Sequence, residues 1–370
     1  MLCWRMPSVT RVCLIGPIPS EGGGVAKSTL YLMYVYRALG YNTTWLTPRN
    51  AKVIRLRECD VICAQGPFPS TLLKSLLLRK RIILTLHGWV LDEVKASIFA
   101  SYTLRDKLKK LLAYVIITIN WLLHKLIFIP LVYDYVTAVS HITAKKNGVK
   151  ALIVPNPTIC KSVNLYRDPS NSTRNNDEVV FITYVSIGGG KIFSVPRLVK
   201  ILYLLNEKLR SLGFEKHVIL YIYGKDVPRN MITSLSRIPY VRFMGYVKDY
   251  LDRLKQADLF LVGYTFPELG HAVLEAICAG VPVAKFTEDF ELEEVIDGYN
   301  GILALSDEEM VEKLVEYVLN MDKIKQRLAI NAKNTIVKRR DFKRIAAIWK
   351  IILKYTLAHS KGRVPLDERL

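Results

Sequence analysis

The fold is decided by residues 257–283, which read ADLFLVGYTFPELGHAVLEAICAGVPV. Residues 257–262 are a short apolar run of the kind that forms a buried parallel strand. A loop follows, and then a helix is predicted over about 270–279. Ligands bind at the carboxyl ends of such strands, and the backbone N–H groups of a helix N-terminus favour phosphate. We therefore expect the loop acid Glu268 and the helix acid Glu275 to lie beside a bound ligand.

This stretch resembles the nucleotide-sugar signature of the retaining glycosyltransferases with the GT-B fold. That family, glycosyl transferase group 1, includes sucrose-phosphate synthases and bacterial mannosyltransferases. Its second acid accepts hydrogen bonds from both ribose hydroxyls, a task suited to a carboxylate, and the resemblance assigns this role to Glu275. The first acid lies near the donor sugar and corresponds to Glu268, and Gly270 also fits the pattern. Six residues separate the two acids, one fewer than the family usually has. The alternative, a surface Glu on an ordinary helix, is weakened by the continuation EAICAGVPV.

Chain length and net charge limit the classes of protein to which this sequence can belong. The chain has 370 residues, 51% of them hydrophobic, which suits two globular α/β domains. The net charge is +20, of which residues 1–160 carry +14 and the remainder +6. A basic first half indicates an anionic partner, such as nucleic acid, acidic lipid or a phosphate-bearing substrate. A solvated basic surface without a partner is the alternative.

The six cysteines show no CxxC pair and no recurring spacing. We expect them to be reduced and buried in a cytoplasmic protein. Residues 1–6 contain Trp and Arg but no apolar segment of a signal peptide. The cysteines are Cys3, Cys13, Cys59, Cys63, Cys160 and Cys278.

A glycine-rich loop, EGGGVAKSTL at 21–30, lies between a predicted strand at 11–15 and a predicted helix. Backbone amides at the start of such a helix can hold phosphate. A Walker P-loop is one interpretation, but it requires Gly directly before the lysine, where this chain has Ala26. The glycosyltransferase family instead opens with Gly-Gly-Val. By that resemblance Gly23 and Gly24 lie over the phosphates and sugar of the donor.

A histidine, His87, follows the predicted strand at 82–86 and precedes Gly88. A lone histidine is more often structural than catalytic. The family commonly has His-Gly or His-Asp at this place, lining the cleft near the donor sugar. The resemblance therefore assigns His87 a catalytic role, with a protonation state that the sequence does not show.

The second half opens with a predicted strand at 179–185 and the loop SIGGGK at 186–191. In the family an Arg and a Lys bind the donor diphosphate here. Lys191 fits the lysine, but Ser186 stands where the Arg is expected, and Arg197 is only a distant substitute. Either backbone amides compensate or donor binding is weak. Close backbone approach to phosphate is expected at Gly188, Gly189 and Gly190.

The segment 105–132 begins with basic residues and continues as an apolar run, interrupted by His124 and Lys125. A spanning helix needs about 20 mostly apolar residues, and a charge within the bilayer costs roughly 2.5–3.5 kcal/mol. A helix in the membrane interface, with cations at the headgroups, fits better. A buried core helix is the alternative. The basic excess favours peripheral contact with an anionic membrane.

The resemblance covers nearly the whole chain and implies the GT-B fold. We expect two Rossmann-like α/β domains facing across a cleft, with a C-terminal helix crossing back to the first domain. The predicted divisions are an acceptor-side domain at 1–160, a linker at 161–178, a nucleotide-sugar domain at 179–340, and the helix and tail at 341–370.

The implied activity is retaining hexosyl transfer from a UDP-, GDP- or ADP-sugar to a glycan or lipid-linked acceptor. Lys191 and the glycine amides would stabilise the departing diphosphate. No cofactor is expected, and no metal, because no Asp-x-Asp motif precedes the donor site. Two alternatives remain: a glycosyltransferase-like protein that has lost activity, and a basic nucleic-acid-binding or P-loop protein. The latter lacks a recognition motif with interleaved aromatic residues, so no nucleic-acid partner is expected.

Overall fold

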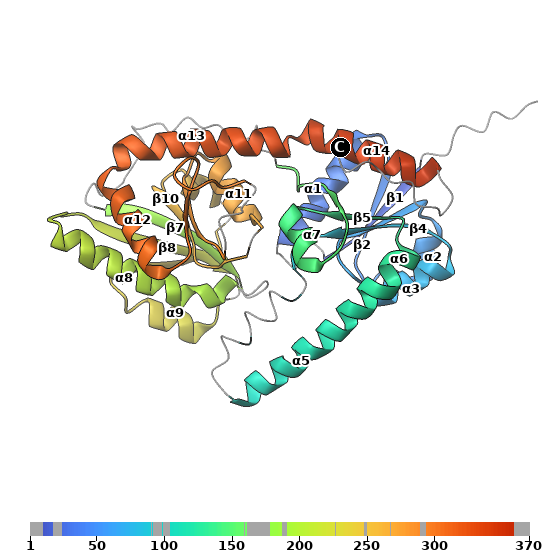
Figure 1. Cartoon of the computed structure of the whole chain (residues 1–370), viewed down its shortest axis with the longest axis horizontal. Helices are drawn as coiled ribbons and strands as arrows, with labels where there is room; N and C mark the ends of the chain where they lie inside the picture. Colours follow the sequence, from blue (N-terminus) through green and yellow to red (C-terminus); the bar gives the residue numbers. More distant parts are fainter. Residues whose placement is uncertain are drawn as a thin grey trace, which may run out of the picture. The chain divides into compact units, whose positions relative to one another are not determined.

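The computed structural model describes residues 10–17, 24–89, 91, 98, 104–158, 160, 178–186, 191–225, 227–247, 250–266, 268–288 and 294–358. The chain divides into two compact units, each built on a parallel six-stranded sheet (Figure 1). One unit comprises Met1–Asp92, Leu108–Thr158 and Arg339–Leu370, and the other comprises Glu93–Lys107 and Ile159–Lys338. The predicted α/β class with two Rossmann-like domains is confirmed. The predicted linker lies outside the described residues apart from Glu178, which begins a strand.

The first unit contains a sheet of order β2-β1-β3-β4-β5-β6. Its central strands are buried throughout or nearly so, which explains why they appear as continuous apolar runs. The strands are β1 Arg11–Ile15, β2 Asn42–Leu46, β3 Val61–Ala64, β4 Arg81–Leu86, β5 Tyr135–Ala138 and β6 Leu152–Ile153, and the shorter helices are α1 Gly24–Ala38, α2 Val53–Arg57, α3 Pro69–Leu77 and α7 His141–Asn147.

The last helix, α14 (Phe342–Ala358), belongs to the first unit. Its Trp349 is buried and meets Tyr36 of α1 edge to face, with 5.2 Å between ring centroids. Ile345 and Leu353 are fully buried in the same core cluster. The predicted return of the C-terminal helix to the first domain is therefore confirmed, and it follows from the apolar face of this helix.

The second unit contains a sheet of order β12-β11-β10-β7-β8-β9. All its pairings are parallel, so the carboxyl ends of the strands share one edge. Its elements are β7 Glu178–Ser186, a 3-10 turn Lys191–Ser194, α8 Val195–Ser211, β8 His217–Lys225, α9 Arg229–Leu235, β9 Val241–Gly245, α10 Tyr250–Leu254, β10 Leu259–Val262, α11 His271–Cys278, β11 Val283–Phe286, β12 Ile302–Ala304, α12 Asp307–Leu319 and α13 Met321–Arg340.

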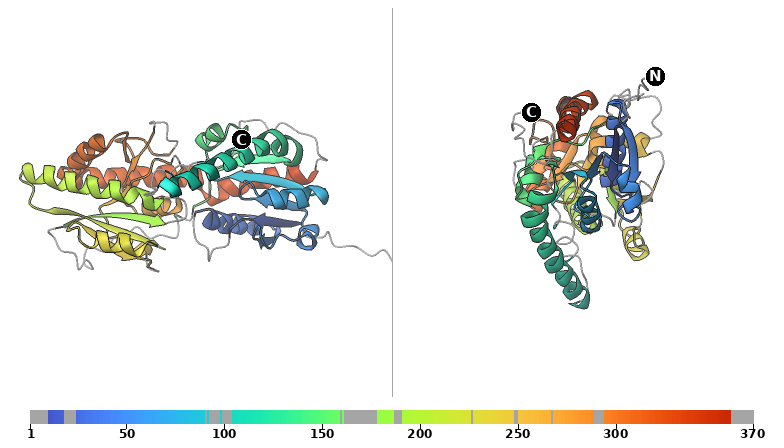
Figure 2. Two further views of the ribbon diagram at one scale, coloured as in Figure 1. Left: turned by 90° about the horizontal axis from the view of Figure 1, so that it is seen from below. Right: turned by 90° about the vertical axis from the view of Figure 1, so that its right-hand side faces the viewer.

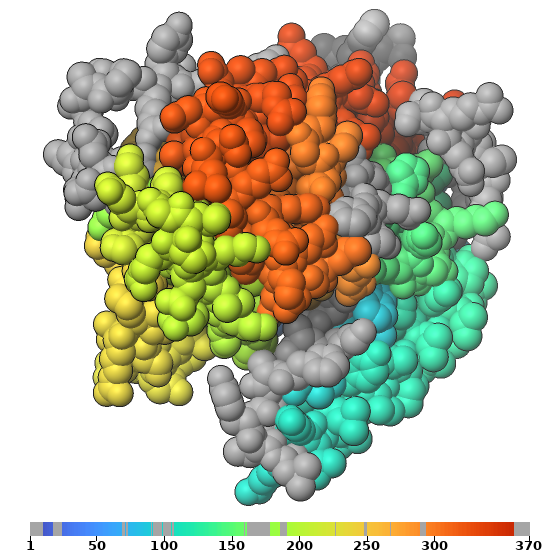
Figure 3. Space-filling model, turned by 60° about the vertical axis from the view of Figure 1, so that its left-hand side comes forward, coloured from blue at the N-terminus to red at the C-terminus, as the bar shows by residue number. Residues whose placement is uncertain are grey.

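A long helical rod occupies residues 104–132, formed by α5 (Leu104–Leu123), a π-helical turn (His124–Phe128) and α6 (Ile129–Val132). Its end is anchored in the first unit, where Trp121 and Val132 are buried in the core. His124 is buried too, and its Nε2 lies 2.8 Å from the Tyr133 hydroxyl. Most of α5 stands clear of the sheet (Figure 2), and its surface is exposed in the space-filling view (Figure 3).

Much of the exposed surface of α5, of the π-helical turn and of α6 is apolar, although Arg105, Lys107 and Lys109 are exposed near the start of α5. Large side chains recur every three or four residues, so they share one face of the helix. We name this face the α5 stripe: Leu108, Leu111, Leu112, Val115, Ile116, Ile119, Leu122, Leu123, Leu126, Ile127 and Leu131, each 45–69% exposed. The alternative of a buried core helix is thus wrong for most of its length. By length and composition Lys107–Val132 is the one candidate membrane span among the described residues.

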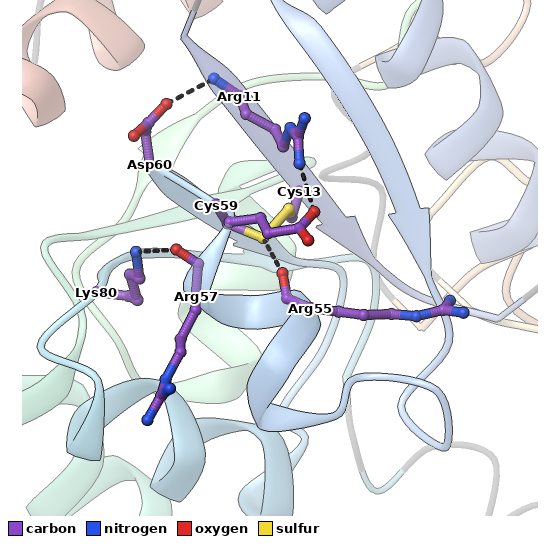
Figure 4. Close-up of a disulfide and its surroundings, with 8 residues drawn as sticks. Arg11, Cys13, Arg55, Arg57, Cys59, Asp60 and Lys80 are labelled. Carbon is purple, nitrogen blue, oxygen red and sulfur yellow. Dashed lines mark hydrogen bonds and ion pairs between the residues drawn. A yellow bond between two sulfur atoms is a disulfide. The ribbon is translucent and has the colours of Figure 1, made fainter.

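Four of the cysteines form two disulfides, Cys13–Cys59 and Cys160–Cys278. The first joins β1 to the segment before β3, beside the bond from Arg11 N to Asp60 (Figure 4). The expectation of reduced cysteines is wrong for these two pairs, because the fold brings together residues that are distant in sequence and have no diagnostic spacing. Cys63 is free and buried, as expected, and Cys3 lies outside the described residues.

Candidate functional site

The second unit gathers its predicted site residues at the carboxyl edge of its sheet. Lys191 begins the turn after β7, and Tyr264 follows β10, which pairs with β7. The Lys191 Nζ lies 4.9 Å from the centroid of the Tyr264 ring, a cation–π contact. This edge is where parallel sheets bind ligands, so the ammonium group is held where an anion would arrive.

Gly270 is the N-cap of α11 and lies against Lys191. A Cβ at this position would be 2.6 Å from the Lys191 Nζ and 3.5 Å from the Tyr264 hydroxyl. Glu275 follows five residues later on the same helix and is half-buried, and Glu268 is half-buried in the preceding loop. The structure therefore brings Lys191 to the start of the helix that carries Glu275. Gly188, Gly189 and Gly190 lie outside the described residues.

Replacing Gly270 with Ala should displace the Lys191 ammonium group. Any residue can adopt the backbone conformation of Gly270 (φ −65°, ψ 157°). The added methyl group therefore strains no backbone angle, and its clash is with the end of the Lys191 side chain. We expect nucleoside diphosphate affinity to fall about tenfold while the thermal midpoint changes little, because a flexible side chain can move aside. Calorimetric titration and thermal unfolding check this, and an unchanged affinity would contradict a role for Lys191 at the phosphates.

Arg197 does not replace the cation that is missing at Ser186. Its Nε donates to Asp307 Oδ1 at 2.6 Å, and its guanidinium stacks on the Phe286 ring at 3.4 Å. Asp307 also accepts from Lys200 Nζ at 2.9 Å. Arg197 is thus held by a carboxylate at the start of α12, and the suggested substitution by this residue is not supported.

The first unit contains a cavity of about 410 Å³ at the carboxyl ends of β1, β2 and β3. Its walls are mostly apolar, with one cation, Arg49, which forms no ion pair or hydrogen bond that we find within the described residues. Gln65 contributes a polar wall. This cavity could not be predicted from the sequence, because it depends on strand order. Its lining is Pro17, Val25, Thr47, Pro48, Arg49, Gln65, Gly66 and Phe68.

His87 lies directly after β4 and is bound to the same glutamine. Its Nε2 lies 2.8 Å from Gln65 Oε1, while Gln65 Nε2 faces the Cys63 carbonyl at 3.5 Å. This orientation makes His87 Nε2 the donor, and leaves Nδ1 as a buried lone pair with no partner among the described residues. Burial lowers the pKa of His87 to about 4, so the imidazole is neutral at neutral pH.

Acid should destabilise the protein through this histidine. Its folded-state pKa of about 4 lies below the ordinary value near 6.5, so the unfolded state binds more protons between those values. Stability is then lost as the pH falls from 6.5 towards 4. We expect the urea midpoint to fall less between pH 6.5 and 5 in His87→Gln than in the wild type. The exposed His217→Gln is the control, and equal falls in all three proteins would contradict the burial of a neutral imidazole.

The glycine-rich loop does not continue as a Walker P-loop would. Gly24 begins α1, and Ser28 and Thr29, which follow the lysine, are buried. Ser28 Oγ donates to the Gly24 carbonyl and Thr29 Oγ1 donates to the Val25 carbonyl. In a P-loop the hydroxyl after the lysine would be directed to a magnesium ion, so this geometry does not favour that alternative. Gly23 lies outside the described residues.

Known proteins are similar in sequence to the part of the second unit that contains the predicted site residues. The family model "Glycosyl transferases group 1" matches residues 191–321, which include Lys191, Gly270 and Glu275. A curated relative, the lipopolysaccharide core biosynthesis glycosyltransferase LpsE of Rhizobium meliloti (strain 1021), is 26% identical over 125 residues. That alignment spans 32% of this chain and 37% of the relative.

Solved structures match almost the whole chain in fold. Sucrose-phosphate synthase from Thermosynechococcus elongatus aligns with a TM-score of 0.69 and 13% identity, covering 95% of this chain and 100% of that one. HepE from Anabaena, in complex with UDP-glucose, aligns with a TM-score of 0.66 and 16% identity, covering 93% and 99%. The resemblance predicted from the sequence is thus confirmed: over residues 191–321 the chain matches the group 1 glycosyltransferases, and its two domains have the GT-B fold.

Proposed function

We propose that this chain is a retaining glycosyltransferase that transfers a sugar from a nucleoside-diphosphate sugar to an acceptor. The observation that carries the proposal is the contact between Lys191 and Gly270 at the start of the helix that bears Glu275. A bound donor could place its diphosphate at Lys191 and its ribose at Glu275. The UDP-glucose complex of HepE supports a nucleotide-sugar donor.

The proposed sugar transfer requires stabilisation of the departing diphosphate. As the bond to the anomeric carbon breaks, negative charge grows on the diphosphate, and preorganised cations and amides stabilise it most in the transition state. Lys191 supplies one cation, and the amino end of α11 supplies backbone N–H groups. Glu275 would hold the ribose hydroxyls, and Glu268 would lie near the sugar. The neutral His87 would accept a hydrogen bond at Nδ1.

The cavity of the first unit is the proposed acceptor site. Apolar walls, the Gln65 amide and the Arg49 guanidinium would suit a hydroxylated acceptor that bears an anionic group. Gln65 connects the cavity to His87 through the bond of 2.8 Å. A glycan or lipid-linked acceptor agrees with the relative LpsE, whose name assigns it to lipopolysaccharide core biosynthesis.

We also propose that the protein works at the cytoplasmic face of an anionic membrane. The α5 stripe offers a continuous exposed apolar face, and basic residues begin the same helix. Apolar side chains would enter the acyl boundary while the cations meet anionic headgroups. The cations are Arg105, Lys107, Lys109 and Lys110. We expect transfer to require neither a metal nor a cofactor.

A nucleotide-sugar screen tests the proposed function. The wild-type protein is mixed with UDP-, GDP- and ADP-sugars, and both the thermal midpoint and release of the nucleoside diphosphate are measured. Stabilisation by one donor class, with slow hydrolysis or transfer, is expected, because ligand binding to the folded state raises the midpoint. Binding without turnover from any donor would favour the inactive glycosyltransferase-like protein. No binding at all would refute the proposal.

A further inference from the structure

One buried lysine of the second unit, Lys285, has no role in the site as described so far. It is the third residue of β11, and its side chain is fully buried. The other residues of that strand, Val283, Ala284 and Phe286, are apolar. Burying an ammonium group is costly unless it is hydrogen-bonded or paired, and the Lys285 Nζ donates to the Phe286 carbonyl at 2.9 Å. The strand thus accommodates a cation in a position where an apolar residue would pack.

The sheet places this lysine near the predicted diphosphate site. Lys285 pairs in register with Val262, the last residue of β10. Tyr264 follows two residues later, and β10 pairs on its other side with β7, after which Lys191 begins a turn. Neighbouring parallel strands end at one edge of the sheet, so Lys285 lies close to that edge.

Tyr264 connects the two lysines. Its ring centroid is 4.9 Å from the Lys191 Nζ and 5.6 Å from the Lys285 Nζ. The two ammonium groups are therefore no farther apart than the sum of these distances. An aromatic ring attracts cations through its quadrupole, which offsets part of the repulsion between two like charges near one site.

We propose that Lys285 supplies the second positive charge for the donor diphosphate, the charge that Ser186 does not carry. The proposal rests on the proposed function. Lys285 is a positioning residue that acts from inside the protein, through Tyr264 and through its electric field, without touching the ligand. Charges interact more strongly away from bulk water, so we expect the buried ammonium of Lys285, which lies beside the same Tyr264 ring as Lys191, to change diphosphate affinity by about tenfold. Arg197, bound to Asp307, does not serve this purpose.

The test compares a diphosphate with its nucleoside. Kd values for UDP and uridine are measured by calorimetry in the wild type and in Lys285→Met, which preserves the length of the side chain and removes its charge. GDP with guanosine and ADP with adenosine are measured in the same way. We expect diphosphate affinity to fall about tenfold and nucleoside affinity to stay within twofold.

Two further variants test whether any loss of diphosphate affinity comes from the charge of Lys285. Lys285→Gln retains a donor for the Phe286 carbonyl, so it removes the charge with the hydrogen bond preserved and serves if Lys285→Met does not fold. The exposed Lys216 precedes β8 at the opposite edge of the same sheet. Lys216→Met therefore makes the same change in net charge away from the site, and should leave both affinities unchanged.

The outcomes separate this inference from the proposed function. If the wild type binds none of the three nucleoside diphosphates, the proposed function fails. If it binds one of them and Lys285→Met binds it equally well, the buried charge is compensated within the fold and the inference is overturned. Equal losses for diphosphate and nucleoside would also overturn it, since they would indicate a purely structural lysine.

Discussion

Retention by anionic vesicles should be lost when the α5 stripe is interrupted. In the triple variant Leu112→Gln, Ile116→Gln and Ile119→Gln, three side chains that are 61%, 56% and 53% exposed become polar. Burial of each such side chain contributes roughly 1.5–3 kcal/mol. Because these side chains are only a little more than half exposed, about half of that free energy applies to each, and losing three should lower partitioning by about a hundredfold at 1.4 kcal/mol per factor of ten. Flotation with vesicles containing phosphatidylserine at low salt measures it.

The control removes apolar surface elsewhere. Tyr203, Leu204 and Leu212 of the second unit are 56%, 37% and 56% exposed, and their triple replacement by Gln should leave flotation unchanged. Because glutamine is a good helix former, α5 itself should persist. Equal flotation of the stripe variant and the wild type would contradict the membrane proposal. Resistance to an alkaline carbonate wash would indicate a spanning helix instead of an interfacial one.

Glu275→Ala should remove most of the affinity for the nucleotide. A hydrogen bond to a charged acceptor contributes roughly 1.5–3 kcal/mol, and the carboxylate is expected to accept two, from the ribose hydroxyls. A loss of about a hundredfold or more in UDP, GDP or ADP affinity follows. Glu275 is half-buried on α11, so the variant should remain folded, with a loss in the free energy of unfolding smaller than its loss in binding free energy. Calorimetry and urea unfolding measure the two quantities.

A control variant removes the same charge at a position away from the proposed nucleotide site. Glu312 lies on α12 and its side chain is 70% exposed, so Glu312→Ala removes the same charge from the same unit. It should bind nucleotide as the wild type does. The role assigned to Glu275 would be refuted if both variants bound equally well, or if Glu275→Ala lost affinity for the nucleotide only in proportion to its stability.

Local sequence predicted the strands of this fold because each central strand is buried on both faces. The apolar run 257–262 predicts a strand, and Leu259–Val262 form β10. The helix expected over 270–279 is α11, His271–Cys278. Apolar runs and helix-ending residues are local signals, so they can be interpreted without knowing how distant segments pair.

Contacts between distant segments were the part that could not be predicted. The neighbours Lys191, Tyr264 and Lys285 lie on or just after β7, β10 and β11, and β7 lies beside β10 in the sheet although β8 and β9 separate them in the chain. Gln65 and His87 follow β3 and β4, which are neighbours in the chain and in the sheet, but strand pairing alone does not show that these two side chains are hydrogen-bonded. The exposure of the α5 stripe was also open, since an apolar helix can be buried in a core or lie in a membrane and its composition does not distinguish the two.

The disulfides determine how this protein responds to reductant. All four bonded sulfurs belong to residues that are at most 4% exposed, so dithiothreitol attacks them only when the surrounding structure opens. Cys278 is the last residue of α11, and its bond to Cys160 ties down the end of the helix opposite Gly270. The rate at which reduced thiols become accessible to an alkylating agent would therefore report how often the end of that helix unfolds locally. This measurement requires neither nucleotide nor sugar.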